Sequence, residues 1–249
     1  MPPFSDHFSH CSADYARYRP HYPTALFDWL AALAPSRQLA WDVATGNGQA
    51  ARGLAERFIR VYASDASQAQ LQQAFPRHNI QYICEHAEET SLKPDSVDLV
   101  CIAQALHWLD MPAFFDEVQR VLKPGGIIAA WCYQRIESEG ELNDVLSHYY
   151  QNIVGPYWPA ERHWVEEGYQ SIQWPFLDYP VSEFYCAAEW SQEELLGYLA
   201  TWSAGQRYQQ QTGHNPLDQI QEALSKAWGE QPRRALRWPL KLRIGTKAR

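Results

Sequence analysis

The chain has 249 residues, 46% of them hydrophobic, which suffices for the core of one domain or of one domain with an insertion. Its net charge of −8 argues against a nucleic-acid substrate, because phosphate binding needs a basic face. No apolar run approaches the roughly 20 residues of a membrane span, and the first ten residues lack the basic and apolar regions of a signal peptide. We therefore expect no membrane partner.

The cysteines favour a reducing compartment. They are dispersed, odd in number and without a C-x-x-C pair, and several fall in apolar strands, where free cysteine behaves as a small apolar residue. We therefore expect a cytoplasmic location. His7, His10 and Cys11 lie close together, but no further ligand cluster supports them, so no metal site is expected. The five cysteines are Cys11, Cys84, Cys101, Cys132 and Cys186.

Residues 1–38 are expected to form an N-terminal helical cap. Apolar residues recur on one side of Tyr22–Leu33, which predicts an amphipathic helix. The segment before it, Tyr15-Ala16-Arg17-Tyr18-Arg19-Pro20, has no helix or strand pattern. Its arginine can pair with a carboxylate of a cofactor or substrate. Alternatively, the two tyrosines pack the first helix against the sheet.

The most informative stretch is Leu39–Leu54, where a short apolar strand containing Asp42 leads into a turn with Gly46 and Gly48 and then an alanine-rich helix. Glycines let the backbone turn tightly and approach a ligand, and the helix start offers free N–H groups. A strand, a glycine-rich turn and a helix start in this order indicate a nucleotide-type cofactor site.

Two cofactor classes use such a turn. The spacing Gly46-x-Gly48-x-x-Ala51, with Asp65 about 20 residues on, fits a dinucleotide fingerprint. Asp42 argues against it, since a carboxylate beside the turn would repel a pyrophosphate. The same carboxylate suits a cationic or amino-bearing ligand.

Strands and helices continue to alternate through residues 39–135, the expected cofactor-binding core. Five strand–helix units predict a parallel sheet with right-handed crossovers. The predicted strands after the first are 59–65, 80–85, 97–103 and 127–132, with a helix over Ala66–Phe75 and a helix and turn over Val118–Gly126.

The pattern changes after the fifth strand. Residues 136–230 predict a helical lid with one strand, and residues 231–249 a terminal strand with seven basic residues and no acid. Aromatic residues crowd the lid, where they either form its core or line a flat substrate pocket. The predicted elements are helices Glu141–Val154, Gln192–Trp202 (with a Ser191–Glu194 capping box) and Pro216–Trp228, and strands Val181–Ala187 and Arg237–Thr246. Pro239 is expected either to limit the last strand near its start or to interrupt its pairing.

Taken together, these motifs resemble the class I S-adenosylmethionine-dependent methyltransferases. The family's first motif is acidic-x-G-x-G-x-G, and here it is Asp42-Val43-Ala44-Thr45-Gly46-Asn47-Gly48, with Ala44 at the first glycine. VQRVLKPGG at Val118–Gly126 is similar to the family's signature before the fifth strand, and Y-x-x-Y-R-P resembles small-molecule methyltransferases of the trans-aconitate methyltransferase type. The resemblance covers residues 1–135 well and the rest loosely.

The resemblance implies a single domain over residues 1–249. Its fold would be α/β and Rossmann-like, a doubly wound, mostly parallel seven-stranded sheet with an antiparallel last strand and a helical, aromatic-rich lid. S-adenosyl-L-methionine would be the cofactor and a small molecule the substrate, with methyl transfer to a hydroxyl or carboxylate oxygen. A carboxylate nucleophile needs no base, whereas a hydroxyl or amine can need one.

The resemblance also implies site residues. Asp65 would hold the ribose hydroxyls, whose spacing suits a carboxylate, unless it only caps the following helix. Ala87 and Glu88 would touch the adenine. His107 and Trp108 would face the substrate as catalytic residues, unless His107 is merely bonded to a loop carbonyl. The implied cofactor-binding residues are Tyr15, Tyr18, Arg19, Asp42, Ala44, Gly46, Gly48, Asp65, Ala66, Ala87, Glu88 and Gln104.

Two other functions stay open at this stage. One is a nicotinamide-dependent oxidoreductase, which Asp42 and the VLKPGG segment argue against. The other is a non-catalytic domain that binds S-adenosylmethionine without a productive substrate site.

Overall fold

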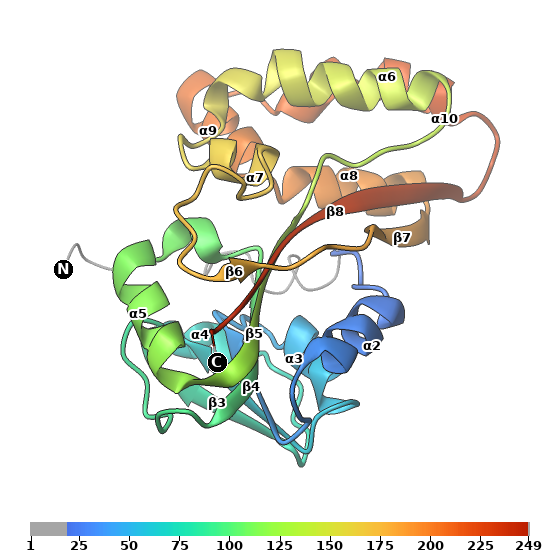
Figure 1. Ribbon diagram of the computed structural model, residues 1–249. Helices are drawn as coiled ribbons and strands as arrows, with labels where there is room; N and C mark the ends of the chain where they lie inside the picture. Colours follow the sequence, from blue (N-terminus) through green and yellow to red (C-terminus); the bar gives the residue numbers. More distant parts are fainter. Residues whose placement is uncertain (1–18, 249) are drawn as a thin grey trace.

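The computed structural model describes residues 19–248, and in it a mostly parallel sheet lies below a layer of helices (Figure 1). The sheet order is β3-β2-β1-β4-β5-β8-β6, and β7 also pairs with β8. The expected parallel core and antiparallel last strand are confirmed. The strands are β1 (Leu39–Val43), β2 (Arg60–Asp65), β3 (Ile80–Cys84), β4 (Val97–Ala103), β5 (Leu122–Tyr133), β6 (Leu177–Asp178), β7 (Phe184–Trp190) and β8 (Arg234–Thr246).

The central strands β1 and β4 are buried almost throughout, which explains why their sequences are continuous apolar runs. Alternate side chains feed two cores. One contains Trp131 and packs under α2 (Thr24–Leu33) and α3 (Gln49–Ala55). The other contains Trp41 and packs under α5 (Met111–Val121). The chain order along the sheet reverses between β1 and β4, the position at which open α/β sheets bind ligands.

The sheet has eight strands where seven were expected, because β6 is an additional short strand. The predicted strand Val181–Ala187 is displaced to Phe184–Trp190, as β7. β6 and β7 both pair with β8, where Asp178 lies opposite Gly245 and Phe184 lies opposite Leu240. Between these two pairs the β6–β7 segment advances by six residues, whereas β8 advances by only five. One residue is therefore extra, as in a bulge, and the ladder is interrupted.

The last strand begins at Arg234, three residues before the predicted start, and Pro239 lies inside it. The N–H and C=O of a strand residue point to the same side, and the Pro239 carbonyl accepts from the Gln134 N–H at 2.8 Å, just beyond the end of β5. The position at which proline lacks an N–H therefore faces the end of the β5–β8 ladder, where few hydrogen bonds remain to be made. Pro239 therefore does not limit the start of the strand, which is the first of the two expectations, while the β5 ladder itself reaches only Leu240.

The helices of residues 136–230 form the lid, the term used here for that segment. The capping box of Ser191 and Glu194 is present, as predicted. Three predicted helices differ. Ala66–Phe75 contains only a four-residue helix with no buried residue to stabilise it, and the other two change helix type partway. The further elements are α4 (Gln68–Leu71), η2 (Leu106–Trp108), α6 (Glu141–His148), the π-turn η3 (Tyr149–Ile153), η4 (Gly155–Tyr157), α7 (Arg162–Glu166), α8 (Gln192–Ala200), α9 (Ser203–Thr212), η5 (Pro216–Gln219) and α10 (Gln221–Trp228).

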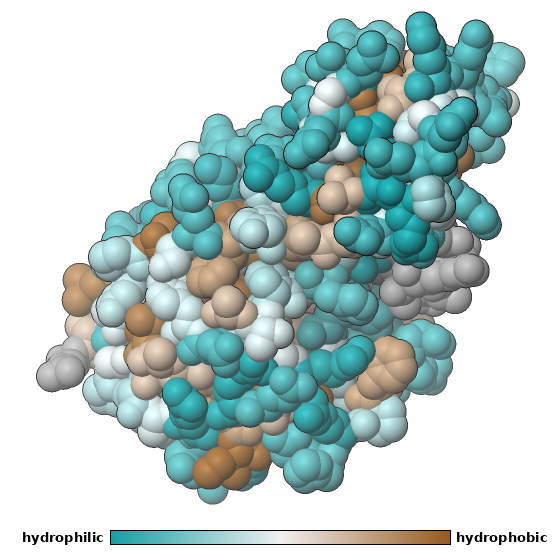
Figure 2. All heavy atoms as spheres, turned by 90° about the vertical axis from the view of Figure 1, so that its right-hand side faces the viewer, coloured by the Kyte–Doolittle hydropathy of each residue, from teal (hydrophilic) through white to brown (hydrophobic). Residues whose placement is uncertain are grey.

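Much of the aromatic content of the lid is packing. Tyr149, Tyr198 and Trp202 are buried. Tyr149 and Tyr198 each lie against Trp202, and Tyr198 also contacts Trp238 of β8. The outer surface of this part of the molecule is correspondingly mainly hydrophilic (Figure 2). Within the described part of the chain, none of the helices combines the length and the apolar composition that crossing a membrane requires.

Candidate active site

The turn after β1 has an unusual backbone at each glycine position of the motif. Ala44, Gly46 and Gly48 have φ values of 49°, 57° and 85°, in the left-handed region. A Cβ added at Gly48 would lie 2.4 Å from the Tyr82 hydroxyl, whereas at Gly46 the nearest atom would be 3.9 Å away. The turn therefore needs glycine at position 48, whereas a Cβ at Gly46 would make only an ordinary contact with Gln70, so the backbone there is not closely covered.

Asp42 is the buried acid beside this turn. Its Oδ2 accepts a hydrogen bond from the Thr45 hydroxyl at 2.5 Å, while Oδ1 has no partner among the described residues. Burial raises the pKa of Asp42 to about 7. Buried acceptors are normally satisfied, so the unpartnered oxygen fits an amino-bearing ligand, as the sequence suggested.

Asp65 connects the ends of β1 and β2. Its two oxygens accept from the backbone N–H groups of Gly46 and Ser67, both at 2.8 Å. Ser67, rather than Asp65, is the residue that directly precedes α4. Ala66 follows Asp65, half-buried, at the same edge of the sheet.

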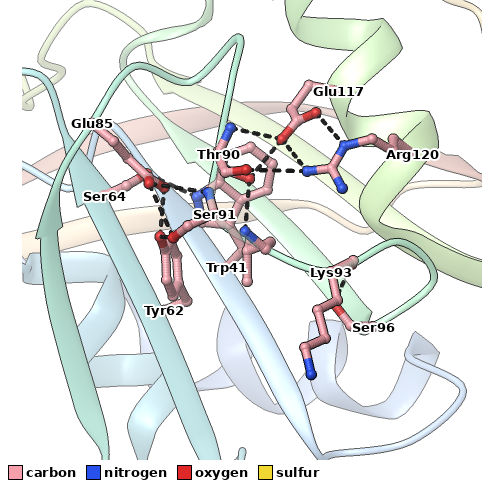
Figure 3. A network of polar contacts seen from close by, with 11 residues as sticks. Trp41, Tyr62, Ser64, Glu85, Thr90, Ser91, Lys93, Ser96, Glu117 and Arg120 are labelled. Atoms are coloured by element: carbon pink, nitrogen blue, oxygen red, sulfur yellow. Dashed lines mark hydrogen bonds and ion pairs between the residues drawn. The ribbon is translucent and has the colours of Figure 1, made fainter.

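The loop after β3, which carries Ala87 and Glu88, is fixed on one side by a polar network (Figure 3). The Tyr62 hydroxyl donates to Glu85 Oε1 at 2.7 Å and contacts Ser91 Oγ at 2.7 Å. Ala87 is buried at this edge.

Its other side is held by α5. Glu117 Oε1 accepts from the Thr90 N–H at 2.8 Å and from its hydroxyl at 2.6 Å, and Arg120 pairs with the same carboxylate (Figure 3). Glu88 Oε1 accepts from the Asp110 N–H at 3.0 Å, so this loop also contacts the segment after η2.

Gln104 ends β4 next to the turn that follows β1. It has a left-handed backbone with φ 62°, uncommon for a non-glycine residue. Its Oε1 accepts from the Tyr133 N–H at 3.3 Å, and its buried Nε2 has no partner among residues 19–248. An amide donor is thus available at this edge of the sheet.

His107 and Trp108 lie side by side in η2, with ring centroids 4.6 Å apart. His107 Nδ1 is 3.1 Å from the Tyr169 hydroxyl, so its partner is a side chain and not the loop carbonyl of the alternative interpretation. Burial, with the positive charge of Arg162, lowers the pKa of His107 to about 3, so the imidazole is neutral at pH 7. Trp108 is 37% exposed.

Arg19 is the described member of the N-terminal motif; Tyr15 and Tyr18 lie outside the described residues. Arg19 donates a hydrogen bond to the Tyr133 hydroxyl at the end of β5, and its guanidinium carbon is 5.3 Å from the Tyr198 ring centre. Arg19 therefore bridges the sheet and the lid.

Sequence reasoning missed Tyr133, Arg162 and Tyr169. Tyr133 follows from one available signal, its position at the end of a predicted strand. Arg162 and Tyr169 lie in a segment without periodic pattern, and only the tertiary fold brings them to η2. Among the described residues, no three His, Cys, Asp or Glu side chains are grouped to hold a metal ion.

Comparison with known proteins gives consistent matches. A family model described as a methyltransferase domain matches residues 41–130. A protein of Dictyostelium discoideum named as a methyltransferase is 31% identical over 229 residues, spanning 90% of this chain and 87% of the relative. A solved structure from Anaeromyxobacter dehalogenans, described as a type II methyltransferase, has 40% identity and a TM-score of 0.89, covering 92% of this chain and 98% of that chain.

A more distant structure shares the fold alone. Phosphoethanolamine N-methyltransferase 2 of Haemonchus contortus, in complex with S-adenosyl-L-methionine, aligns with a TM-score of 0.51 and 18% identity, over 98% of this chain and 58% of that one.

Proposed function

Since this chain belongs to the class I S-adenosylmethionine-dependent methyltransferases, we propose that it methylates an oxygen atom of a small-molecule acceptor, and that the oxygen is that of a carboxylate. The family assignment replaces the nicotinamide-dependent alternative left open by the sequence. S-adenosyl-L-methionine supplies an electrophilic methyl group on a positively charged sulfur.

The residues at the carboxyl ends of the strands are suited to hold that cofactor. In our proposal Asp65 binds the ribose hydroxyls of the cofactor, and the loop with Ala87 and Glu88 contacts its adenine. The turn at Gly46 lets the cofactor approach the backbone. The unpartnered Asp42 Oδ1 supports a role toward the amino group, where an anion is favoured. Gln104 contributes its free amide donor.

The observation that carries the choice of acceptor is the state of His107. A general base works best with a pKa near the operating pH, and the pKa of His107 is lowered to about 3 by burial and by Arg162. His107 is therefore a weak base that can orient an acceptor through hydrogen bonds. A carboxylate suits this site because it is already ionised at pH 7.

The reaction then needs only alignment and exclusion of water. A carboxylate oxygen forms the new O–C bond as the C–S bond breaks, and the bonding pair stays on sulfur. One anion and one cation become a neutral methyl ester and a neutral thioether, so no proton has to move.

The pH dependence of turnover tests this choice. With saturating S-adenosylmethionine, the turnover of a carboxylic acid should be nearly constant from about pH 6 to 9, because the acid stays ionised. His107→Asn, which keeps hydrogen-bonding capacity, should retain measurable turnover. Methylation of hydroxyl compounds only, with a rate that rises steeply with pH and is abolished in His107→Asn, would contradict the carboxylate proposal.

A further inference from the structure

Arg162 is a half-buried cation in the lid that the cofactor site does not use. Its guanidinium carbon lies 4.5 Å from the Trp158 ring centre and 5.5 Å from that of Tyr150, and its Nε donates to the Tyr150 hydroxyl at 3.0 Å. Two aromatic rings and one hydrogen bond therefore fix the guanidinium plane.

Its two terminal nitrogens make no ion pair or hydrogen bond within residues 19–248. Glu166 reaches the guanidinium only indirectly, since its Oε1 accepts from the Tyr150 hydroxyl at 2.7 Å. The orientation thus leaves the end of the fork available, the geometry with which arginine binds a carboxylate through two parallel hydrogen bonds.

The groups that Arg162 influences on the sheet side are uncharged. Its charge acts on His107, Cys132 and Tyr169. Burial, with the charge of Arg162, lowers the pKa of His107 to about 3. Burial raises the pKa of Cys132 to about 12 and raises the pKa of Tyr169 well above its usual value. All three are neutral at pH 7, so none of these described groups supplies a counter-charge to the guanidinium.

The position of Arg162 also relates it to the catalytic edge. It is the first residue of α7, which packs against η2, the element with His107 and Trp108. Val165 of the same helix accepts hydrogen bonds from Cys132 Sγ and Gln134 Nε2, at the end of β5. The helix that carries the arginine is thereby attached to the sheet.

We propose that Arg162 is the specificity-determining residue of this enzyme, binding a carboxylate of the acceptor with its two terminal nitrogens, beside the contacting rings of Tyr150 and Trp158. The proposal rests on the function proposed above and names the residue that selects anionic acceptors. Where the bound carboxylate is the one methylated, the neutral ester loses its attraction to Arg162, which favours product release.

Binding calorimetry on the protein loaded with S-adenosylhomocysteine tests the anchor without requiring turnover. The probes are benzoate, phenylacetate and succinate, with benzamide as the neutral counterpart of benzoate. Benzoate or another acid should bind and benzamide should not. Arg162→Gln should weaken acid binding roughly 10- to 100-fold, the loss of a charged hydrogen bond, with S-adenosylhomocysteine affinity unchanged.

Arg237→Gln is the matched control, because it removes an equal charge from an exposed pair with Glu137 and should leave acid binding unchanged. If Arg162→Gln fails to fold, Arg162→Lys replaces it in the binding experiment. A lysine keeps the charge but loses the two-pronged geometry, so acid binding should again be weaker than in wild type. Equal affinity in wild type and the Arg162 variant, or no binding of the three acids to wild type, overturns the proposal. Binding that depends on Arg162, without methylation of any bound acid, contradicts the proposed function and leaves the anchor intact.

Discussion

At the scale of single residues, left-handed backbones gather where the ligands are proposed to bind. Of the four non-glycine residues with positive φ in the described chain, Ala44, Gln104 and Tyr169 lie around the proposed site and Asp95 does not. Such conformations cost energy and persist where the surrounding structure fixes them. The strained positions mark the site independently of any motif.

Ala44 provides a direct test of this strain. A left-handed backbone costs an alanine about 1–2 kcal/mol, and a glycine avoids this cost. The glycine also raises the conformational entropy of the unfolded chain, which offsets about 0.4–1 kcal/mol of the stabilisation. Ala44→Gly should therefore raise the free energy of unfolding by roughly 0.5–1 kcal/mol in urea titrations. Ala103→Gly, in the ordinary strand conformation of β4, should lower it. If Ala44→Gly lost as much stability as Ala103→Gly, the backbone at Ala44 would not be strained.

Asp42 should make the apoprotein less stable as the pH rises. Burial raises its folded-state pKa from 3.8 to about 7, so the folded protein binds more protons than the unfolded chain between these values. The stability contributed by the neutral acid is fully present below about pH 4 and is lost as the pH rises through 7. Asp42→Asn, which stays neutral, should be more stable than wild type at pH 8 by roughly 2–4 kcal/mol, and similar to it at pH 4.

Asp98 is the control of opposite sign. Lys123, Ser36 and the Leu39 N–H hold the pKa of this buried acid below its usual value even though burial opposes them. Asp98→Asn should therefore destabilise the protein at pH 8, and the difference should shrink as the pH falls toward 3. Parallel urea titrations at several pH values check both acids. Equal pH profiles for wild type and Asp42→Asn would contradict the assignment for Asp42.

At the scale of elements, burial decided what the sequence could predict. β4 has the predicted bounds and β1 begins at the predicted Leu39, because both strands are almost completely buried, mainly apolar runs flanked by turns. The short strand β6 and the displacement of β7 were missed, since both depend on the register along β8, which the local sequence does not encode. The helix after Asp65 was overestimated because its periodic residues are not buried.

The same reasoning applies to the candidate site. Asp42 and the glycine turn follow from local chemistry, since strand, acid and turn are consecutive in the chain. Arg162 and Tyr169 are both more than 50 residues from His107 in sequence, and Tyr169 is 62 residues away. No local pattern can therefore link them to His107. Only the packing of α7 against η2 brings them there.

The adenine-side loop gives an element-scale prediction. Glu117→Gln keeps one acceptor but loses the charge that binds Thr90 and Arg120. We expect faster amide exchange over residues 85–92 and weaker binding of S-adenosylhomocysteine by about 10-fold, near the lower end for a charged hydrogen bond. Hydrogen-exchange mass spectrometry and calorimetry measure the two effects. Glu56→Gln, on exposed pairs with Arg57 and Arg77, is the control and should change neither. Unchanged exchange in Glu117→Gln means that the network does not hold the loop.

At the scale of the whole molecule, the sheet and the lid share one strand. The second half of β8 pairs with β5 and its first half pairs with β7 beside the lid helices (Figure 1). Unfolding of either part therefore breaks a ladder of the other. We expect the described chain to unfold as one cooperative unit.

Cofactor binding should stabilise that unit as a whole. At 100 times the dissociation constant, a ligand adds about 2.7 kcal/mol to the free energy of unfolding, which raises Tm by roughly 5–10 °C for a domain of this size. S-adenosylhomocysteine should produce this shift in a single transition, and NAD should not. A shift with NAD and none with S-adenosylhomocysteine would contradict the cofactor assignment.

The position of β8 also has a consequence for biosynthesis. β8 is inserted between β5 and the β6–β7 edge, yet it is translated after all three. While the ribosome is still making β8, the nascent chain holds two strand edges that have no partner, and unpaired edges promote association with other chains. The interval between the emergence of β7 and of β8 is therefore the period in which this polypeptide most needs a chaperone.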